Sequence, residues 1–122
     1  MQKEIHLKEK PRGFHLVTPE IMRELPELRS IKIGMMNVFI MHTSASLTIN
    51  ENADPTVRQD FESYFNYAVP ENEPYYLHQD EGADDLPAHL KSSLLGSSLN
   101  IPIADGKAST CANTEITVAA AV

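Results

Sequence analysis

The chain has 122 residues, of which 42% are hydrophobic and 22% are charged, and this length suits one globular domain with its own core. Its formal net charge of −7 excludes a surface that broadly attracts nucleic acid or anionic membrane. A single Cys excludes an internal disulfide framework, and no apolar run approaches membrane-spanning length. The first residues also lack the apolar core of a signal peptide, so we expect a soluble, cytoplasmic protein.

The first forty residues predict a strand, a helix and a second strand. Residues 2–8 alternate in polarity as a short, charged edge strand does. Thr18, Pro19 and Glu20 then open a helix, with Thr18 as its cap and Pro19 in the first turn. Residues 31–41, IKIGMMNVFIM, are almost all apolar, which favours a strand that is covered on both faces.

Residues 42–58, HTSASLTINENADPTVR, concentrate polar side chains directly after this strand. Residues 44–50 alternate polar and apolar side chains, which is the period of a strand with one polar face. Asp54 and Pro55 are typical of a helix start. We expect His42, the polar strand face and the helix start to converge in one site. The alternative is that His42 and Asn50 are hydrogen-bonded core groups and Asp54 is only a cap.

The second half begins with a long loop. Residues 69–85 are rich in Pro, Gly and acidic residues, and long loops in small domains are often functional. A third helix follows, capped by Asp84 or Asp85 and ended by Gly96, and Leu86, Leu90 and Leu94 lie one turn apart on its expected core face.

Two further strands complete the chain. Residues 97–103 predict a strand that is closed by the turn residues Asp105 and Gly106, and residues 114–122 predict a final strand. Helices and strands in this order indicate an α+β fold, with helices packed on a mixed or antiparallel sheet. We expect one domain over residues 1–122.

Three His residues lie at element ends or in the long loop, which suggests a metal site. His42, His78 and His89 all have acidic neighbours in sequence. The carboxylates that could bind an ion directly or support its ligands are Glu51, Asp80, Glu81, Asp84 and Asp85. Three imidazoles with one open position suit a catalytic zinc or a similar divalent ion. The spacing matches no compact ligand motif, so the metal site is one hypothesis among several.

Two basic residues suggest a site for phosphate. Arg58 and Lys91 each lie on a predicted helix beside a capping Asp, and Ser44 is among the hydroxyl residues nearby. Cations, hydroxyls and helix N-termini are the usual components of a phosphate site. The alternative is that each cation is solvated and pairs with a neighbour on its own helix.

These motifs, in this order, resemble the YjbQ family of conserved proteins, also called UPF0047. The resemblance extends from about Arg12 to Gly106 and rests on residues 42–52 (HTSASLTINEN), 54–58 (DPTVR), 81–85 (EGADD), 87–93 (PAHLKSS) and 96–99 (GSSL). Members of the family continue with a Gly-Thr-Trp-Gln strand, whereas residues 107–122 contain no Trp and form an atypical tail.

The resemblance implies a YjbQ-like α+β domain, a homotrimer, and secondary thiamine-phosphate synthase activity. That reaction joins a pyrimidine diphosphate to a thiazole phosphate and releases pyrophosphate. The shared polar positions of the family fall here on His42, Ser44, Asn50, Glu51, Asp54, His78, Glu81, Asp84, His89 and Lys91.

Three hypotheses follow for the function. The first is an enzyme for phosphorylated small molecules, with thiamine-phosphate synthesis as its reaction and a zinc or magnesium ion as its cofactor. The second is a module that binds a metal or ligand without turnover, and the third is a metal-dependent phosphohydrolase. We assign catalysis to His42, Glu51 and His89; substrate binding to Ser44, Asn50, Arg58 and Lys91; and metal binding to His42, His78 and His89.

Overall fold

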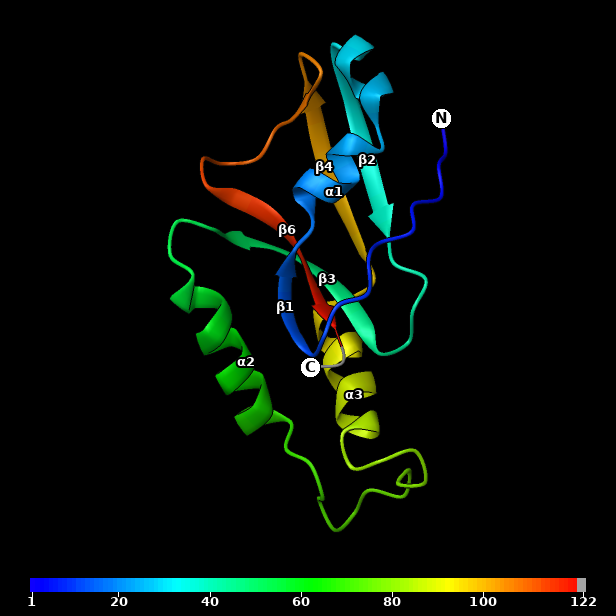
Figure 1. The fold of residues 1–122 in the computed structure, drawn as a ribbon, viewed down its shortest axis with the longest axis vertical. Helices are drawn as coiled ribbons and strands as arrows, with labels where there is room; N and C mark the ends of the chain where they lie inside the picture. Colours follow the sequence, from blue (N-terminus) through cyan, green and yellow to red (C-terminus); the bar gives the residue numbers. More distant parts are fainter. Residues whose placement is uncertain (121–122) are drawn as a thin grey trace.

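Two three-stranded antiparallel sheets carry the fold in the computed structural model, which describes residues 1–120 (Figure 1). The first sheet has the order β1-β6-β3, and its strands are β1 (Gly13–Leu16), β6 (Thr114–Ala120) and β3 (Ala45–Glu51). The second has the order β2-β4-β5, and its strands are β2 (Ile33–Phe39), β4 (Ser98–Ala104) and β5 (Lys107–Ala108). The expected α+β class is therefore confirmed, with antiparallel pairing in both sheets.

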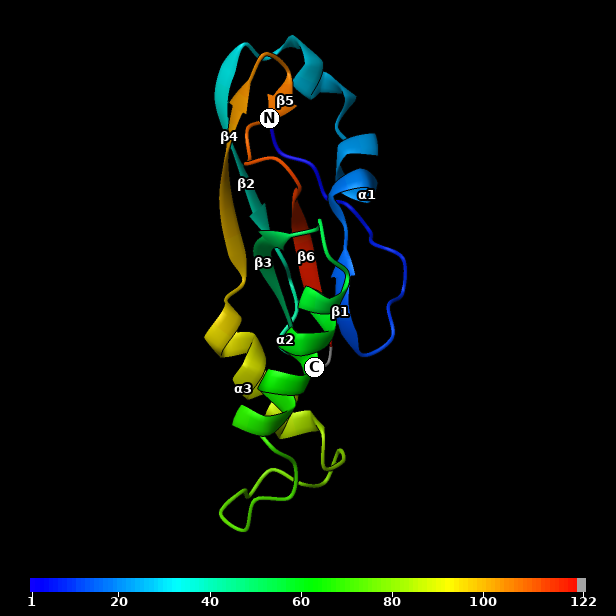
Figure 2. The same cartoon turned by 90° about the vertical axis from the view of Figure 1, so that its left-hand side faces the viewer.

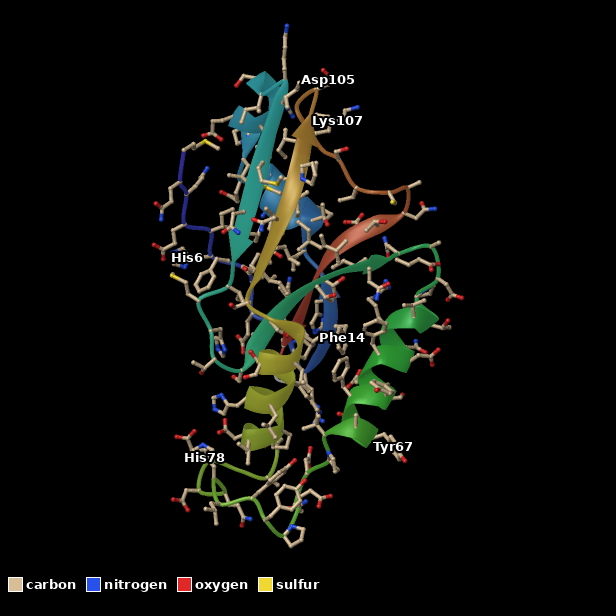
Figure 3. The ribbon with its side chains drawn as sticks, turned by 180° about the vertical axis from the view of Figure 1, so that it is seen from behind. His6, Phe14, Tyr67, His78, Asp105 and Lys107 are labelled. Carbon is tan, nitrogen blue, oxygen red and sulfur yellow. The ribbon has the colours of Figure 1, made fainter. Side chains whose placement is uncertain are left out.

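The helices lie beside the sheets. Residues 1–120 contain α1 (Thr18–Arg23), the 3-10 helix η1 (Pro26–Ser30), α2 (Thr56–Ala68) and α3 (Asp85–Leu95). Phe61 and Phe65 of α2 pack on Phe14 of β1, which lies between α2 and the sheet (Figure 3). No helix in the described part of the chain is long and apolar enough to cross a membrane.

The main core fills the space between the sheets and under α1 (Figure 2). Buried apolar side chains come from both sheets, from α1 and η1, and from the residues that precede these two helices; they are Val17, Ile21, Leu25, Leu28, Met36, Leu47, Ile101, Ile103, Ile116 and Val118. Alternation along each strand places these side chains on one face. The opposite face of the β1-β6-β3 sheet carries Ala119, which packs under α2.

The C-terminal tail supplies a central strand. The predicted final strand is confirmed as β6, which pairs with β1 on one side and with β3 on the other. Ile116, at 2% exposure, pairs across with Ile49 in the same sheet. The last two residues of the predicted strand, 121–122, lie outside the described residues. The atypical sequence of the tail therefore still forms the middle of a sheet.

The predicted turn at Asp105 and Gly106 and the predicted helix end at Gly96 are confirmed. Asp105 (φ 49°) and Gly106 (φ 75°) form the turn between β4 and β5, with the two positive φ angles that a tight hairpin requires. Gly96 ends α3 with φ 95°. The second predicted helix begins one residue later than expected, at Thr56, with Pro55 and not Asp54 in the cap position. Asp54 Oδ1 accepts hydrogen bonds from the Thr56 hydroxyl at 2.7 Å and from the Thr56 N–H at 2.8 Å, and these bonds lower the pKa of Asp54.

Two predictions for the N-terminal segment are wrong. Residues 2–8 form no strand, because no strand of residues 1–120 pairs with this backbone; Ile5 and Leu7 instead pack on the core as an extended segment. Thr18 is not the cap of α1, since its hydroxyl accepts the N–H of Ile116 at 2.7 Å and the cap position is Val17. In both cases, contacts with distant parts of the chain override the local pattern.

The prediction that the 31–41 strand is covered on both faces is also wrong. The inward face of β2 carries Met36 at 8% exposure, but the outward face carries Ile33, Met35 and Phe39 at 90%, 65% and 61%. No element of residues 1–120 covers that outward face, because the β1-β6-β3 sheet and α1 both lie on the other, core-facing side of β2 (Figure 2). His42 therefore follows a strand that is buried on one side only.

The predicted core face of the third helix is wrong as well. Leu90 and Leu94 are 39% and 69% exposed, and the buried side chains of α3 are Pro87, Ala88 and Lys91. The helix is rotated so that its small residues approach β3. This rotation buries a lysine and brings Asp85 and His89 to one side of the helix.

Candidate metal centre and adjoining cavity

Three potential metal ligands meet where the long loop joins α3. His78 comes from the loop, Asp85 is the first residue of α3, and His89 follows one turn later on the same face. Asp85 Oδ2 accepts a hydrogen bond from His78 Nε2 at 2.8 Å and lies 3.3 Å from His89 Nε2. An ion bound here would take the place of the proton that His78 donates. One ligand atom from each residue lies within 4.8 Å of the others, which is close enough to share one ion. Figure 3 shows His78 at the end of the molecule opposite Asp105 and Lys107.

The hydrogen bonds of His89 define which of its nitrogens is free. Its Nδ1 lies 3.0 Å from the carbonyl oxygen of Thr43. A carbonyl only accepts, so Nδ1 carries a proton and donates it. In the neutral ring, Nε2 then presents a lone pair toward the carboxylate of Asp85. The Nε2 lone pair and the carboxylate oxygen, 3.3 Å apart, could both bind one cation.

His42 has the opposite arrangement. Its Nδ1 accepts the backbone N–H of Ser44 at 3.1 Å, so the neutral ring carries its proton on Nε2. A protonated nitrogen is a donor and not a metal ligand. His42 also lies outside the group formed by His78, Asp85 and His89. The structure therefore places His42 beside the candidate metal centre as a hydrogen-bond donor.

A cavity of about 370 Å³ joins His42 to the candidate centre. Its lining comes from the loop before β3 and from one face of α3 with the turn that follows it: His42, Thr43, His89, Ser92, Ser93, Gly96 and Ser97. The Ser92 hydroxyl donates to the carbonyl of Ala45 at 2.9 Å, and the Ser93 hydroxyl donates to the carbonyl of His89 at 2.9 Å. Within residues 1–120, neither Lys nor Arg lines the cavity.

Three predicted site residues lie at the other end of β3. Asn50 and Glu51 line a second cavity of about 460 Å³, and Arg58 donates to the side-chain oxygen of Asn52 nearby at 2.8 Å. Because β3 has seven residues, its two ends are about 20 Å apart. Within one chain, Asn50, Glu51 and Arg58 therefore lie at the opposite end of β3 from the group formed by His78, Asp85 and His89 (Figure 1).

Lys91 lies between helices and does not face the cavity. It is 1% exposed, and its Nζ donates to Asn66 Oδ1 of α2 at 2.8 Å. The same oxygen accepts from Arg12 at 2.7 Å, and Arg12 also pairs with Glu71 at 2.8 Å. Burial, with a further contribution from Arg12, lowers the pKa of Lys91. This network connects α3 to α2 and to the segment before β1.

Asp85 is the candidate ligand that the assigned site residues do not include. The sequence offers it as a helix cap and as one of several carboxylates that could bind an ion directly or support its ligands, and in the structure it contacts both imidazoles. The signal is present in the sequence, because Asp85 and His89 are four residues apart on a predicted helix and so share a face. Ser44 lies at the edge of the site, where its backbone N–H and hydroxyl contact His42.

The fold and this site define an α+β domain with a candidate histidine-carboxylate metal centre at one end. A sequence profile described as "UPF0047 protein YjbQ-like" matches residues 3–120. The chain is 51% identical over 109 residues to "UPF0047 protein YjbQ" of Escherichia coli O157:H7, covering 89% of this chain and 78% of that protein. It therefore belongs to the UPF0047/YjbQ family of uncharacterised conserved proteins.

Solved structures have the same fold. A YjbQ/UPF0047 protein from Clostridium acetobutylicum matches with a TM-score of 0.79 and 34% identity, over 92% of this chain and 84% of that one. The conserved hypothetical protein TT1486 from Thermus thermophilus matches with a TM-score of 0.77 and 30% identity, over 88% and 80%. The expected family and its fold are confirmed.

Proposed function

We propose that this chain is a metal-assisted enzyme that acts on phosphorylated small molecules, with a divalent cation bound by His78, Asp85 and His89. The observation that carries the proposal is the orientation of His89. Its Nδ1 donates to the backbone of Thr43, and this bond directs Nε2 toward Asp85. An imidazole held through its second nitrogen in this way is the usual arrangement of a metal-binding histidine.

The donor set favours zinc over magnesium. Two imidazole nitrogens and one carboxylate oxygen suit zinc-like ions, whereas magnesium prefers oxygen ligands alone. Three protein ligands also leave a fourth position for a substrate oxygen, which is the pattern of catalytic rather than structural zinc sites.

The phosphate group of the substrate is expected to bind at this ion, because no Lys or Arg of residues 1–120 lines the adjoining cavity. Lys91 and Arg58, the cations that the sequence suggests for phosphate, lie elsewhere. His42 faces the cavity with a protonated Nε2, which suits it to donate a hydrogen bond to a leaving phosphate oxygen. This assigns metal binding to His89 and proton donation to His42.

Thiamine-phosphate synthesis, which the family resemblance implies, is the reaction that we propose. The bond between the pyrimidine methylene carbon and the diphosphate oxygen breaks, and its electron pair leaves with pyrophosphate. A new bond forms between that carbon and the thiazole nitrogen. A cation at the diphosphate and a donor at the departing oxygen both stabilise the negative charge that develops.

The test measures two reactions, thiamine phosphate formation and phosphoester hydrolysis, together with metal binding, in wild-type protein and in the variant His89→Ala. The proposal expects formation of thiamine phosphate from its two precursors, lost in His89→Ala and retained in His6→Ala, which alters a surface histidine outside the site. Hydrolysis of simple phosphoesters without synthesis would instead support a phosphohydrolase. Metal binding without either reaction would support a non-catalytic module.

We also propose that the chain assembles as a homotrimer through the outward face of β2. Ile33, Met35 and Phe39 on this strand, and Met41 after it, are 61–90% exposed and form an apolar stripe. Such a stripe on an edge strand is typical of a surface that is covered in an assembly.

The assembly is tested by sedimentation of the wild type and of the variant Met35→Lys. We expect trimers for the wild type and monomers for the variant. The control Tyr67→Lys alters a large, 85% exposed side chain on α2, which points away from the sheets (Figure 3), and should remain trimeric. A monomeric wild type would contradict the proposal.

A further inference from the structure

The helix that carries two of the candidate metal ligands, α3, buries the more polar of two possible faces. Leu86, Leu90 and Leu94 form an apolar stripe along α3, yet Leu90 and Leu94 are 39% and 69% exposed. Lys91 lies inward instead and is 1% exposed. Successive residues lie about 100° apart around a helix axis, so a turn of α3 by about that angle would bury Leu90 in place of Lys91. Hydrophobic burial alone therefore does not explain the observed rotation of α3.

Polar contacts on two sides of α3 hold the observed rotation. On one side, His89 Nδ1 donates to the carbonyl of Thr43 at 3.0 Å, and the hydroxyl of Ser92 donates to a backbone carbonyl of β3 at 2.9 Å. On another side, Lys91 Nζ donates to Asn66 Oδ1 of α2 at 2.8 Å. His89 and Lys91 are two positions apart, so they lie about 200° apart around the axis. A change in the direction of Lys91 therefore also changes the direction of His89.

The bond to Asn66 satisfies a buried charge. An ammonium group that is buried without an acceptor is strongly unfavourable, so the inward position of Lys91 depends on this bond. Asn66 is itself held in place, because the same Oδ1 accepts from Arg12 at 2.7 Å and Arg12 pairs with Glu71 at 2.8 Å. The bond thus offsets the exposure of the leucine stripe and favours the observed face.

We infer that the hydrogen bond between Lys91 and Asn66 sets the rotation of α3 and so positions the metal ligands of this helix. Without the bond, α3 turns to expose Lys91, and the turn moves His89 away from Thr43. Asp85 lies on the same side of α3 as His89 and moves with it. Lys91 and Asn66 are therefore positioning residues that do not bind the ion themselves. The inference rests on the proposed function, because it takes Asp85 and His89 to bind the ion.

Three variants separate positioning from general stability. Asn66→Leu removes the acceptor and leaves a buried charge without it. Lys91→Met replaces the ammonium by an apolar side chain of similar length, which can stay inward without an acceptor. The double variant Asn66→Leu/Lys91→Met therefore removes both members of the bond and leaves no unsatisfied charge. Gln59→Leu is the matched control, because it replaces an exposed amide on the same helix as Asn66.

The first readout is the Kd for zinc, measured by competition with a chromophoric chelator while circular dichroism shows that each protein is folded. Asn66→Leu should weaken zinc binding by at least about tenfold, as loss of a group that supports a metal ligand does. Lys91→Met, the double variant and Gln59→Leu should bind zinc as the wild type does. A variant that is merely less stable would keep its affinity for zinc as long as it is folded.

The second readout reports the rotation of α3 without any metal. Cys111 is the one cysteine of the chain, so Leu94→Cys in a Cys111→Ser background gives a single thiol on the exposed leucine stripe. This thiol should react readily with a thiol reagent. Adding Asn66→Leu should slow the reaction, because the stripe turns inward, and adding Lys91→Met as well should restore the rate.

The outcomes separate this inference from the proposed function. The inference is wrong if Asn66→Leu leaves the labelling rate unchanged, whether or not zinc affinity falls, because the helix has then not turned. It is also wrong if slower labelling leaves zinc affinity unchanged, or if Lys91→Met fails to restore both. A wild type that binds no zinc would contradict the proposed function, and the labelling rates would then decide alone whether the bond sets the rotation of α3.

Discussion

If His78, Asp85 and His89 bind zinc as proposed, replacing Asp85 by Asn should abolish most of the stabilisation that zinc would confer on the folded chain. The substitution preserves the volume of the side chain but removes the negative charge that faces His78 at 2.8 Å and His89 at 3.3 Å. An amide binds zinc far more weakly than a carboxylate does. Because the effect requires the metal, it appears as a difference between melting curves with and without zinc.

The expected size follows from binding linkage. At a zinc concentration of about 100 times the wild-type Kd, binding stabilises the folded state by about 2.7 kcal/mol. Loss of a group that only supports a ligand weakens binding by about 10–100-fold, so we take about 100-fold for Asp85 itself. The variant then gains only about 0.4 kcal/mol at that concentration. With about 4 °C per kcal/mol for this size of domain, Tm rises by about 11 °C in the wild type and about 2 °C in Asp85→Asn.

The matched control is Asp84→Asn, which removes the preceding acidic residue. Asp84 is exposed and lies outside the three-residue group, so this variant should retain the full zinc-induced rise in Tm. Differential scanning fluorimetry at one zinc concentration measures all three proteins. Equal rises in the wild type and in Asp85→Asn would refute the assignment of Asp85 as a ligand.

Three further predictions concern stability. Burial lowers the pKa of Lys91 below its ordinary 10.5, so between the lowered pKa and 10.5 the folded chain binds fewer protons than the unfolded chain does. Denaturant titrations should therefore show that the wild type gains stability relative to Lys91→Met as pH rises toward 10.5. A stability difference that stays constant with pH would contradict this. Ile116→Ala should cost about 2–5 kcal/mol in urea unfolding, because Ile116 is 2% exposed in the central strand, and a loss below about 1 kcal/mol would argue against a tail that pairs centrally. Gly106→Ala should lower Tm more than Gly96→Ala does. Both glycines have positive φ, but a Cβ at Gly106 would lie 2.8 Å from the backbone of Arg29, whereas a Cβ at Gly96 would have no heavy atom within 4 Å. Equal losses of Tm would mean that only φ matters.

The element types were largely predictable because their signals are local. The turn at Asp105 and Gly106, the end of α3 at Gly96 and the final strand all follow from residues that favour one backbone conformation. The family was also recognisable from the ordered motifs between residues 42 and 99.

The choice of faces was not predictable, because it depends on what packs against each element. The α3 sequence offers a face with Leu90 and Leu94 and a face with Ala88 and Lys91, and hydrophobicity selects the first. The fold selects the second, because small residues allow α3 to approach β3 and Lys91 finds Asn66 as a partner. The apolar sequence of residues 31–41 likewise could not show whether both faces of this strand are covered by other elements of the described chain or only one face is, as in β2.

The site was predictable in part for the same reason. Sequence proximity grouped His42 with Asn50 and Glu51, but an extended strand carries residues that are about eight positions apart to opposite ends of the sheet. His78 and His89 were grouped correctly in space, with their rings 5.9 Å apart. The distinction between His42 as a donor and His89 as a candidate metal ligand depends on the hydrogen bonds of each ring, which no sequence pattern indicates.

The most direct test of the account is the metal content per chain of purified wild-type protein and two variants, measured by elemental analysis. The account predicts one divalent ion per chain in the wild type and in His42→Ala, and almost none in the double variant His78→Ala/His89→Ala. A wild type without a divalent ion, or an ion lost in His42→Ala but retained in the double variant, would contradict it.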